Sequence, residues 1–288
     1  MAPLILITTL TLGAVYSLIG VGFVVMFRAT GVLSFAQGAF FLLASLVFYS
    51  LTNAGLGLWI GLIVATILVG LAGALCYLTV FRPAGYNLLF VSLATVGLGT
   101  AIESAAALGW GSNLFEPKQL LPVHAHRLPG SIRITDSQIV TIIMAIILIA
   151  ALFALIYRTP VGLRMRAVAN DSSLAAYGGV RVTRISALAW GISAAAAGAA
   201  GVGYTLGTVI DPTSLPSLGI VVFPAIIIGG LDSLGGVAVG SLVLALVQTV
   251  VSVYVGSTWQ DIVAYGLLLA LLWVRPTGLF GSRNLVRV

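Results

Sequence analysis

The chain has 288 residues, of which 60% are hydrophobic and 7% charged, and its formal net charge at pH 7 is +6. A soluble protein of 29.7 kDa could not shelter that much apolar surface from water. The basic excess does not indicate nucleic-acid binding, because long uncharged runs divide the chain and a membrane protein uses its basic residues for orientation.

Nine uncharged or nearly uncharged runs follow one another along the chain. They cover residues 4–27, 34–51, 54–81, 87–110, 137–157, 185–210, 217–231, 233–256 and 259–274. A helix needs about 20 apolar residues to cross a hydrocarbon core about 30 Å thick. The sequence therefore predicts an all-α polytopic membrane protein of about eight to nine transmembrane helices, in a single domain over residues 1–288. The runs 217–231 and 259–274 are short, so we expect half-helices or tilted helices there.

The distribution of charge predicts the orientation. If the arginines between Arg158 and Arg184 are cytoplasmic, alternating the nine crossings places ten of the 13 basic residues on that side. Cytoplasmic loops of membrane proteins carry such an excess. We therefore expect the N-terminus outside and the C-terminus in the cytoplasm.

Two segments interrupt the apolar pattern. Residues 111–136 form an outer loop that is too polar to span, and its His124 and His126 have no further ligands nearby to hold a metal. Residues 158–184 form an Arg-rich cytoplasmic segment, in which Asp171 or Ser172 can cap a short helix that Gly178 and Gly179 end. Such a segment suits docking of another protein, although an ordinary positive-inside loop has the same composition.

Polar residues within or beside the runs are the candidates for a substrate path, because polar groups in hydrocarbon are costly and usually face a bundle interior or water. The candidates are Ser34, Gln37, Ser92, Thr95, Glu103, Asp232 and Ser233. Helical spacing places Ser92, Thr95, Gly99 and Glu103 on one face. The alternative is that these groups only bond neighbouring helices, or that Glu103 reaches the outer headgroups.

Small residues and turns give further expectations. Glycine pairs one helical turn apart, such as Gly236 and Gly240, predict close helix packing. The segments 31–36 and 230–235 resemble each other and both turn from the cytoplasm back into the membrane, which suggests an internal repeat. Small residues and a polar side chain at 34–38 and 229–236 predict helices that are broken at these places.

Enzymatic chemistry is missing from the sequence. A P-loop requires Gly-Lys-Ser/Thr, but the only lysine is Lys118, between Pro117 and Gln119. No histidine lies within a run to activate a buried serine. We expect no catalytic residue, no metal site and no cofactor in this chain.

Several motifs, in order and spacing, resemble one transporter family over nearly the whole chain. They are GAVYSLIGVGFVVMFRATGVLSFAQGAF at 13–40, ATVGLG at 94–99, RTPVGLRMRAVANDSSLAAYGGV at 158–180, AGAAGV at 197–202, IIGGLDSLGGVAVG at 227–240 and RPTGLFG at 275–281. The chain resembles the permease subunits of branched-chain amino acid ABC importers, the LivH-type permeases of the hydrophobic amino acid uptake family.

This resemblance implies a heteromeric importer in the bacterial inner membrane. The implied partners are a second permease, two cytoplasmic ATPases that bind ATP and Mg²⁺, and a periplasmic or lipid-anchored solute-binding protein. It also implies that the cytoplasmic segment couples to the ATPases through Arg164, Arg166, Asn170, Asp171, Ala175, Ala176, Gly178 and Gly179.

The implied substrates are branched-chain or other hydrophobic amino acids, and related systems carry urea, short amides or aromatic acids. A secondary transporter coupled to ions is an alternative class. Such a transporter would need ionisable residues inside the membrane for coupling, and Glu103 alone is weak support for it.

Overall fold

The structure, a computed structural model, describes residues 2–82, 88–118, 120–121, 125–128, 132–275 and 278–280. The helices are α1 (Ala2–Thr30), α2 (Gln37–Asn53), α3 (Leu58–Cys76) with its π-helical continuation (Tyr77–Phe81), α4 (Leu88–Trp110), α5 (Asp136–Arg158), α6 (Pro160–Asn170), α7 (Ser172–Tyr177), α8 (Val182–Thr205), α9 (Ser217–Val221), α10 (Phe223–Gly229), α11 (Leu234–Tyr254) and α12 (Gln260–Val274), the last preceded by a 3₁₀ turn (Ser257–Trp259).

Seven of the described helices are long and apolar enough to cross a membrane, namely α1, α3, α4, α5, α8, α11 and α12 with their continuations. The segments Gln37–Asn53 and Ser217–Gly229 are shorter apolar helices. The nine predicted runs are therefore all helical. The short helix expected in 217–231 is confirmed, whereas Ser257–Val274 is long enough to be a candidate span. The run 34–51 was expected to be a full span, but its helix begins only at Gln37.

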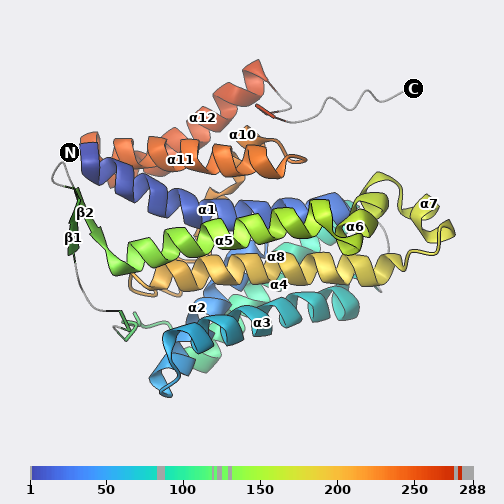
Figure 1. Cartoon of the computed structure of the whole chain (residues 1–288), viewed down its shortest axis with the longest axis horizontal. Helices are drawn as coiled ribbons and strands as arrows, with labels where there is room; N and C mark the ends of the chain where they lie inside the picture. Colours follow the sequence, from blue (N-terminus) through green and yellow to red (C-terminus); the bar gives the residue numbers. More distant parts are fainter. Residues whose placement is uncertain are drawn as a thin grey trace.

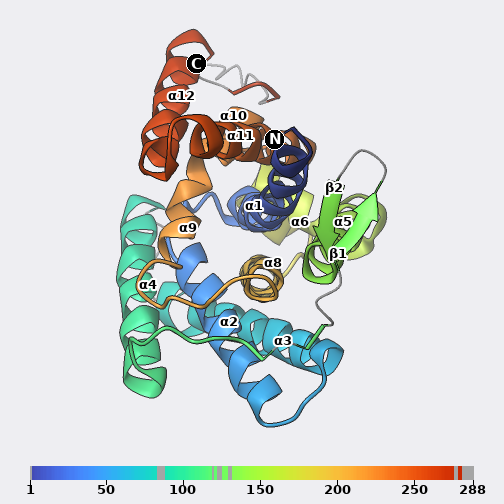
Figure 2. The same ribbon diagram turned by 90° about the vertical axis from the view of Figure 1, so that its left-hand side faces the viewer.

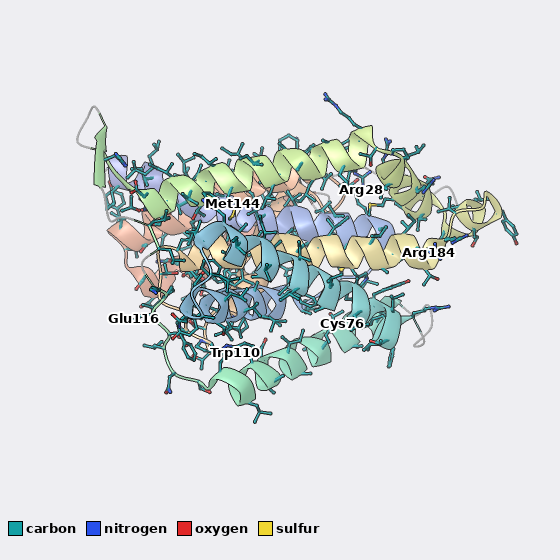
Figure 3. All side chains as sticks on the ribbon, turned by 60° about the horizontal axis from the view of Figure 1, so that its bottom comes forward. Arg28, Cys76, Trp110, Glu116, Met144 and Arg184 are labelled. Atoms are coloured by element: carbon teal, nitrogen blue, oxygen red, sulfur yellow. The ribbon has the colours of Figure 1, made fainter. Side chains whose placement is uncertain are left out.

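The long helices run along one direction, so that the bundle has two distinct ends (Figure 1). We call them the hairpin end, where β1 (Ala125–Leu128) pairs antiparallel with β2 (Ile132–Thr135), and the α7 end. This small hairpin was not predicted within the loop 111–136. Figure 3 shows Arg28 and Arg184 toward the α7 end and Glu116 toward the hairpin end, which is the separation of charge expected from the sequence.

Helix α1 is the centre of the bundle. Viewed from the hairpin end, it lies among α5, α8 and α11 (Figure 2). Of its most apolar stretch of 18 residues, 72% is buried. Polar contacts accompany this packing, because the Tyr16 hydroxyl donates to Gln248 Oε1 at 2.9 Å and the Ser17 hydroxyl donates to the Ala238 carbonyl at 3.3 Å. Both partners belong to α11, which therefore fixes the position of α1.

Small residues allow the other helices to approach closely. A Cβ added at Gly22 would lie 2.7 Å from the Ala196 Cβ, and one added at Gly70 would lie 3.1 Å from the Ala195 Cβ. Gly236 and Gly240 pack in the same way against the backbone of α10. The predicted glycine pair Gly236 and Gly240 therefore serves packing within the chain.

Two glycines with positive φ turn the chain at the α7 end. Gly31 (φ 71°) follows α1 and Gly230 (φ 97°) follows α10, where the similar segments 31–36 and 230–235 were expected to turn. The chain then behaves differently, since residues 31–34 are non-helical whereas α11 begins at Leu234. The turns are confirmed, and the internal repeat stays a prediction.

Candidate transport route and coupling segment

Two short helices begin at the same place halfway through the bundle. The backbone of Gly38 at the start of α2 touches the backbone of Pro216 and Gly219, just before and within α9. The depth of this contact follows from Gln37, whose Nε2 donates to Ser193 Oγ at 2.5 Å. Ser193 is the twelfth of the 24 residues of α8, so the crossing of α2 and α9 lies near the middle of the membrane.

Side chains of α4 replace the missing helical bonds of the linker 31–36. The Leu33 amide donates to Ser92 Oγ at 3.2 Å, and the Phe35 amide donates to Thr95 Oγ1 at 2.9 Å. Unwound backbone inside a membrane requires such partners, because hydrocarbon offers none. The two candidate path residues Ser92 and Thr95 thus hold the backbone of the linker.

Ser34 and Gln37 are buried within this crossing. Ser34 is 0% exposed and its hydroxyl accepts from the Ala36 amide at 3.3 Å. Gln37 is 2% exposed, and its Oε1 has no hydrogen-bond partner among the described residues. These two candidates stabilise the break in the helix and do not line an open surface of the chain.

The three remaining path candidates lie elsewhere. Glu103 is half-buried further along α4, and the contact with the linker is made by Ser92 and Thr95 instead. Asp232 and Ser233 lie in the turn between α10 and α11, and the Ser233 hydroxyl caps α11 by accepting from the Gly236 amide at 3.0 Å. The structure therefore does not bring the seven candidates together.

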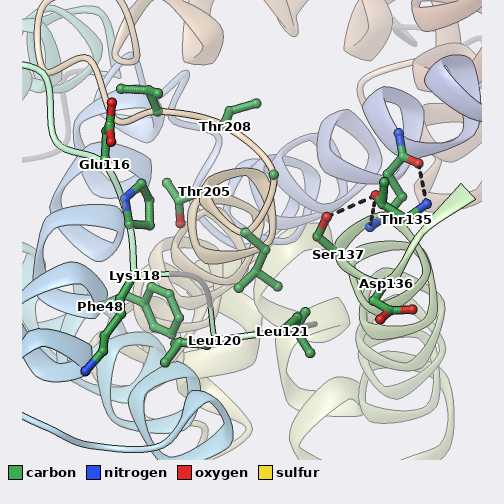
Figure 4. Close-up of a pocket in the computed structure, with 15 residues that line it drawn as sticks. Phe48, Glu116, Lys118, Leu120, Leu121, Thr135, Asp136, Ser137, Thr205 and Thr208 are labelled. Atoms are coloured by element: carbon green, nitrogen blue, oxygen red, sulfur yellow. Dashed lines mark hydrogen bonds between the residues drawn. The ribbon is translucent and has the colours of Figure 1, made fainter. Parts of the chain in front are cut away.

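A cavity of about 500 Å³ opens at the hairpin end. Its lining combines Glu116 and Lys118 after α4, Asp136 at the start of α5, Thr205 at the end of α8 and Thr208 just beyond it (Figure 4). A capping box at Thr135, whose hydroxyl accepts from the Gln138 amide at 3.4 Å, fixes the start of α5 beside it. Charged, hydroxyl and apolar groups therefore meet where the bundle opens, a combination that no sequence motif indicated.

The segment 158–184 forms two short helices at the α7 end, and the second is the short helix that the sequence predicted. Thr159 caps α6 with Pro160 in its first turn, and Asp171 caps α7 by accepting from the Ser173 and Leu174 amides at 2.8 and 2.9 Å. Gly179 (φ 81°) follows the end of α7. Local capping chemistry therefore sets the boundaries of both helices.

The two alanines among the coupling candidates, Ala175 and Ala176, do not share one surface of α7. Ala176 is exposed, but Ala175 is buried against a cluster that includes Met165, Val168 and Ile185. In a helix this short, one side must pack on the parent chain, and Ala175 is on that side. The large exposed groups are instead Leu174 at 66% and Tyr177 at 89% exposure, which the sequence analysis missed.

The basic candidates differ from each other. Arg164 is exposed, whereas the Arg166 guanidinium lies 5.7 Å from the centre of the Tyr157 ring and its Nε is buried. Asn170 is the last residue of α6 and is exposed, as is Gly178 after α7. Of the arginines, Arg164 is thus available to a partner, while Arg166 packs on its own chain.

The fold and these features define the class of protein. The chain is a multi-pass membrane permease with helices broken at mid-depth. Residues 5–272 match the family described as the permease component of branched-chain amino acid transport systems. The chain belongs to this family, as its motifs predicted.

Curated relatives agree with this assignment over nearly their full length. The chain is 28% identical to the high-affinity branched-chain amino acid transport permease LivH of Escherichia coli K12, over 96% of this chain and 95% of the relative. It is 29% identical to BraD of Pseudomonas aeruginosa over 98% and 97%, and 25% identical to a probable LivH of Methanocaldococcus jannaschii over 92% and 88%. No solved structure matches the chain significantly.

Proposed function

We propose that this chain is the transmembrane permease subunit of an ABC importer that carries branched-chain or other hydrophobic amino acids across the bacterial inner membrane. The observation that carries the proposal is the family match over residues 5–272. The relatives named for branched-chain amino acid transport cover 92% or more of the chain. The helices broken at mid-depth support it, since such breaks border substrate paths in transporters.

The energy for transport comes from partner chains in this proposal. Two ATPases hold ATP and Mg²⁺, a second permease completes the membrane part, and a solute-binding protein delivers the substrate. The sequence supports this division, because its only lysine, Lys118, is not in a P-loop. The exposed helix α7 is the proposed contact for an ATPase.

Uptake by the reconstituted complex tests the substrate. Proteoliposomes that contain the whole complex and ATP should accumulate radiolabelled leucine, isoleucine and valine, with urea in excess leaving the rate unchanged. A complex whose ATPases lack the P-loop lysine is the control and should show no uptake. Accumulation of urea or an aromatic acid without leucine would contradict the proposed substrate class.

We further propose that the hairpin end is outside and the α7 end is cytoplasmic. In a Cys76→Ala background, His126→Cys should react with an impermeant thiol reagent added to intact cells. Arg181→Cys should react only after permeabilisation, since both positions are exposed but at opposite ends. The reverse pattern would overturn the orientation and the contact between α7 and the ATPase with it.

A further inference from the structure

The segment between α8 and α10 descends from the hairpin end to the middle of the bundle. Near its start, Ile210 and Phe115 exchange two backbone hydrogen bonds of 2.9 Å, at the end where the loop after α4 lies. Six residues later, Pro216 touches Gly38 at mid-depth. The residues from Asp211 to Ile220 therefore run from the hairpin end to mid-depth without forming a continuous helix.

One side of this segment is exposed and polar. Thr213, Ser214 and Ser217 are exposed, and Asp211 is partly exposed. The Thr213 hydroxyl donates to Asp211 Oδ1 at 2.7 Å and the Ser217 hydroxyl donates to the Ser214 carbonyl at 2.6 Å, so each hydroxyl oxygen keeps lone pairs for an outside donor.

Lipid is an unsuitable neighbour for this side. Non-helical backbone at membrane depth is tolerated only against protein or water, and a carboxylate at the membrane surface favours water as well. Figure 2 shows α9 between α4 and α12, at the edge of the chain.

The exposed faces of α3 and α5 show the contrasting pattern. Their large exposed side chains are aliphatic and include Ile67 and Leu71 on α3 and Ile146 and Ile147 on α5. These helices are continuous, and aliphatic surface is what lipid chains contact. The chain therefore distinguishes a lipid-facing surface from the side of α9.

Apolar groups continue the same surface toward the α7 end. Ile220 is 50% exposed, and Phe35 is 37% exposed where its ring stacks on that of Phe223 at 5.0 Å between centroids. The surface thus changes from hydroxyls and a carboxylate near the hairpin end to aliphatic and aromatic groups at mid-depth.

We propose that the exposed side of residues 211–220, together with Phe35 and Phe223, is a water-facing wall of the transport route. Hydroxyl oxygens and water serve the charged groups of an amino acid, and Ile220 with the stacked rings receives its apolar side chain. The substrate class in this inference rests on the function proposed above, whereas the exposure of the wall to water is independent of that function.

Thiol labelling tests the wall. In a Cys76→Ala background, Ser217→Cys and Ile220→Cys are compared with Leu71→Cys and Ile146→Cys, two positions that are each 62% exposed in the chain. The whole complex is labelled with an impermeant thiol reagent in open membrane fragments, so that sidedness plays no part. The wall thiols should react about tenfold faster or more, because apolar surroundings raise a thiol pKa and each unit of rise removes about nine-tenths of the thiolate.

Excess leucine separates the two parts of the inference. Slower labelling of Ile220→Cys with leucine supports both the wall and the substrate class. Fast labelling without protection by leucine supports the wall and counts against the substrate class. Labelling of both wall positions as slow as that of Leu71→Cys would show that this side faces lipid or protein, and the inference would be wrong.

Discussion

Replacing Gly38 by alanine is expected to abolish transport and to lower the amount of folded protein in the membrane. The new Cβ would overlap the carbonyl of Pro216, and backbone atoms on both sides of the contact leave no flexible side chain to yield. Ordinary overpacking costs about 1–3 kcal/mol, and a clash between two backbone segments belongs at or above the upper limit. Membrane abundance, thermal stability in detergent and leucine uptake are the measurements.

Gly97→Ala is the matched control for Gly38→Ala. Gly97 is also a helical glycine, but a Cβ there would meet no atom within 4 Å, so stability and uptake should stay as in the unsubstituted protein. Gly219→Ala should reproduce the defect, because its Cβ would overlap the Gly38 amide nitrogen from the other side. Normal uptake by Gly38→Ala would mean that α2 and α9 do not meet in this contact.

Replacing both Leu174 and Tyr177 by alanine is expected to release the ATPases while leaving the permease folded. Both side chains are exposed on α7, so their removal creates no cavity within the chain. Loss of a large aromatic anchor at an interface costs about 2 kcal/mol or more, which is a roughly 30-fold weaker association. Co-purification of the ATPases and ATP-driven uptake should decline together.

Two further variants control the test of α7. Tyr254→Ala removes a tyrosine that is 69% exposed at the end of α11, away from α7, and should leave the complex intact. Arg164→Ala should have a smaller effect than the double change, since an exposed charge contributes little to an interface. A double variant that retains its ATPases and its uptake rate would show that α7 is only a basic loop between two spans.

The sequence predicted most elements because the chemistry that specifies them is local. Uninterrupted apolar runs indicated the long helices, and Asp171 identified the start of α7 through its capping side chain. The break in the helix near 31–36 was expected from the turn and the small residues there, but the partners of its backbone were not. Its amides are held by Ser92 and Thr95, which lie far along the chain and give no local signal.

The polar residues of the proposed wall were missed because Thr213 and Ser214 fall between the predicted runs 185–210 and 217–231, and Ser217 was counted as the outer end of the second run. The structure places Ser217 next to Pro216 at mid-depth. The length of the next run gave the available signal, since 15 residues of helix extend only about 22 Å and cannot cross a 30 Å core. The residues before it therefore had to enter the membrane.

The direction of the Ala175 side chain could not be predicted from the sequence either, because it depends on how α6 and α8 pack.

The central position of α1 imposes an order on biogenesis. This helix leaves the ribosome well before α11, yet its Tyr16 and Ser17 bond to α11, which begins about 200 residues after α1 ends. At about 5–20 residues per second, synthesis of the intervening chain takes roughly 10–40 s. During that interval the insertion machinery or surrounding lipid must accommodate a helix whose final neighbours do not yet exist. Nascent chains that stop before Leu234 would expose in the bilayer the surface of α1 that α11 covers in the finished protein.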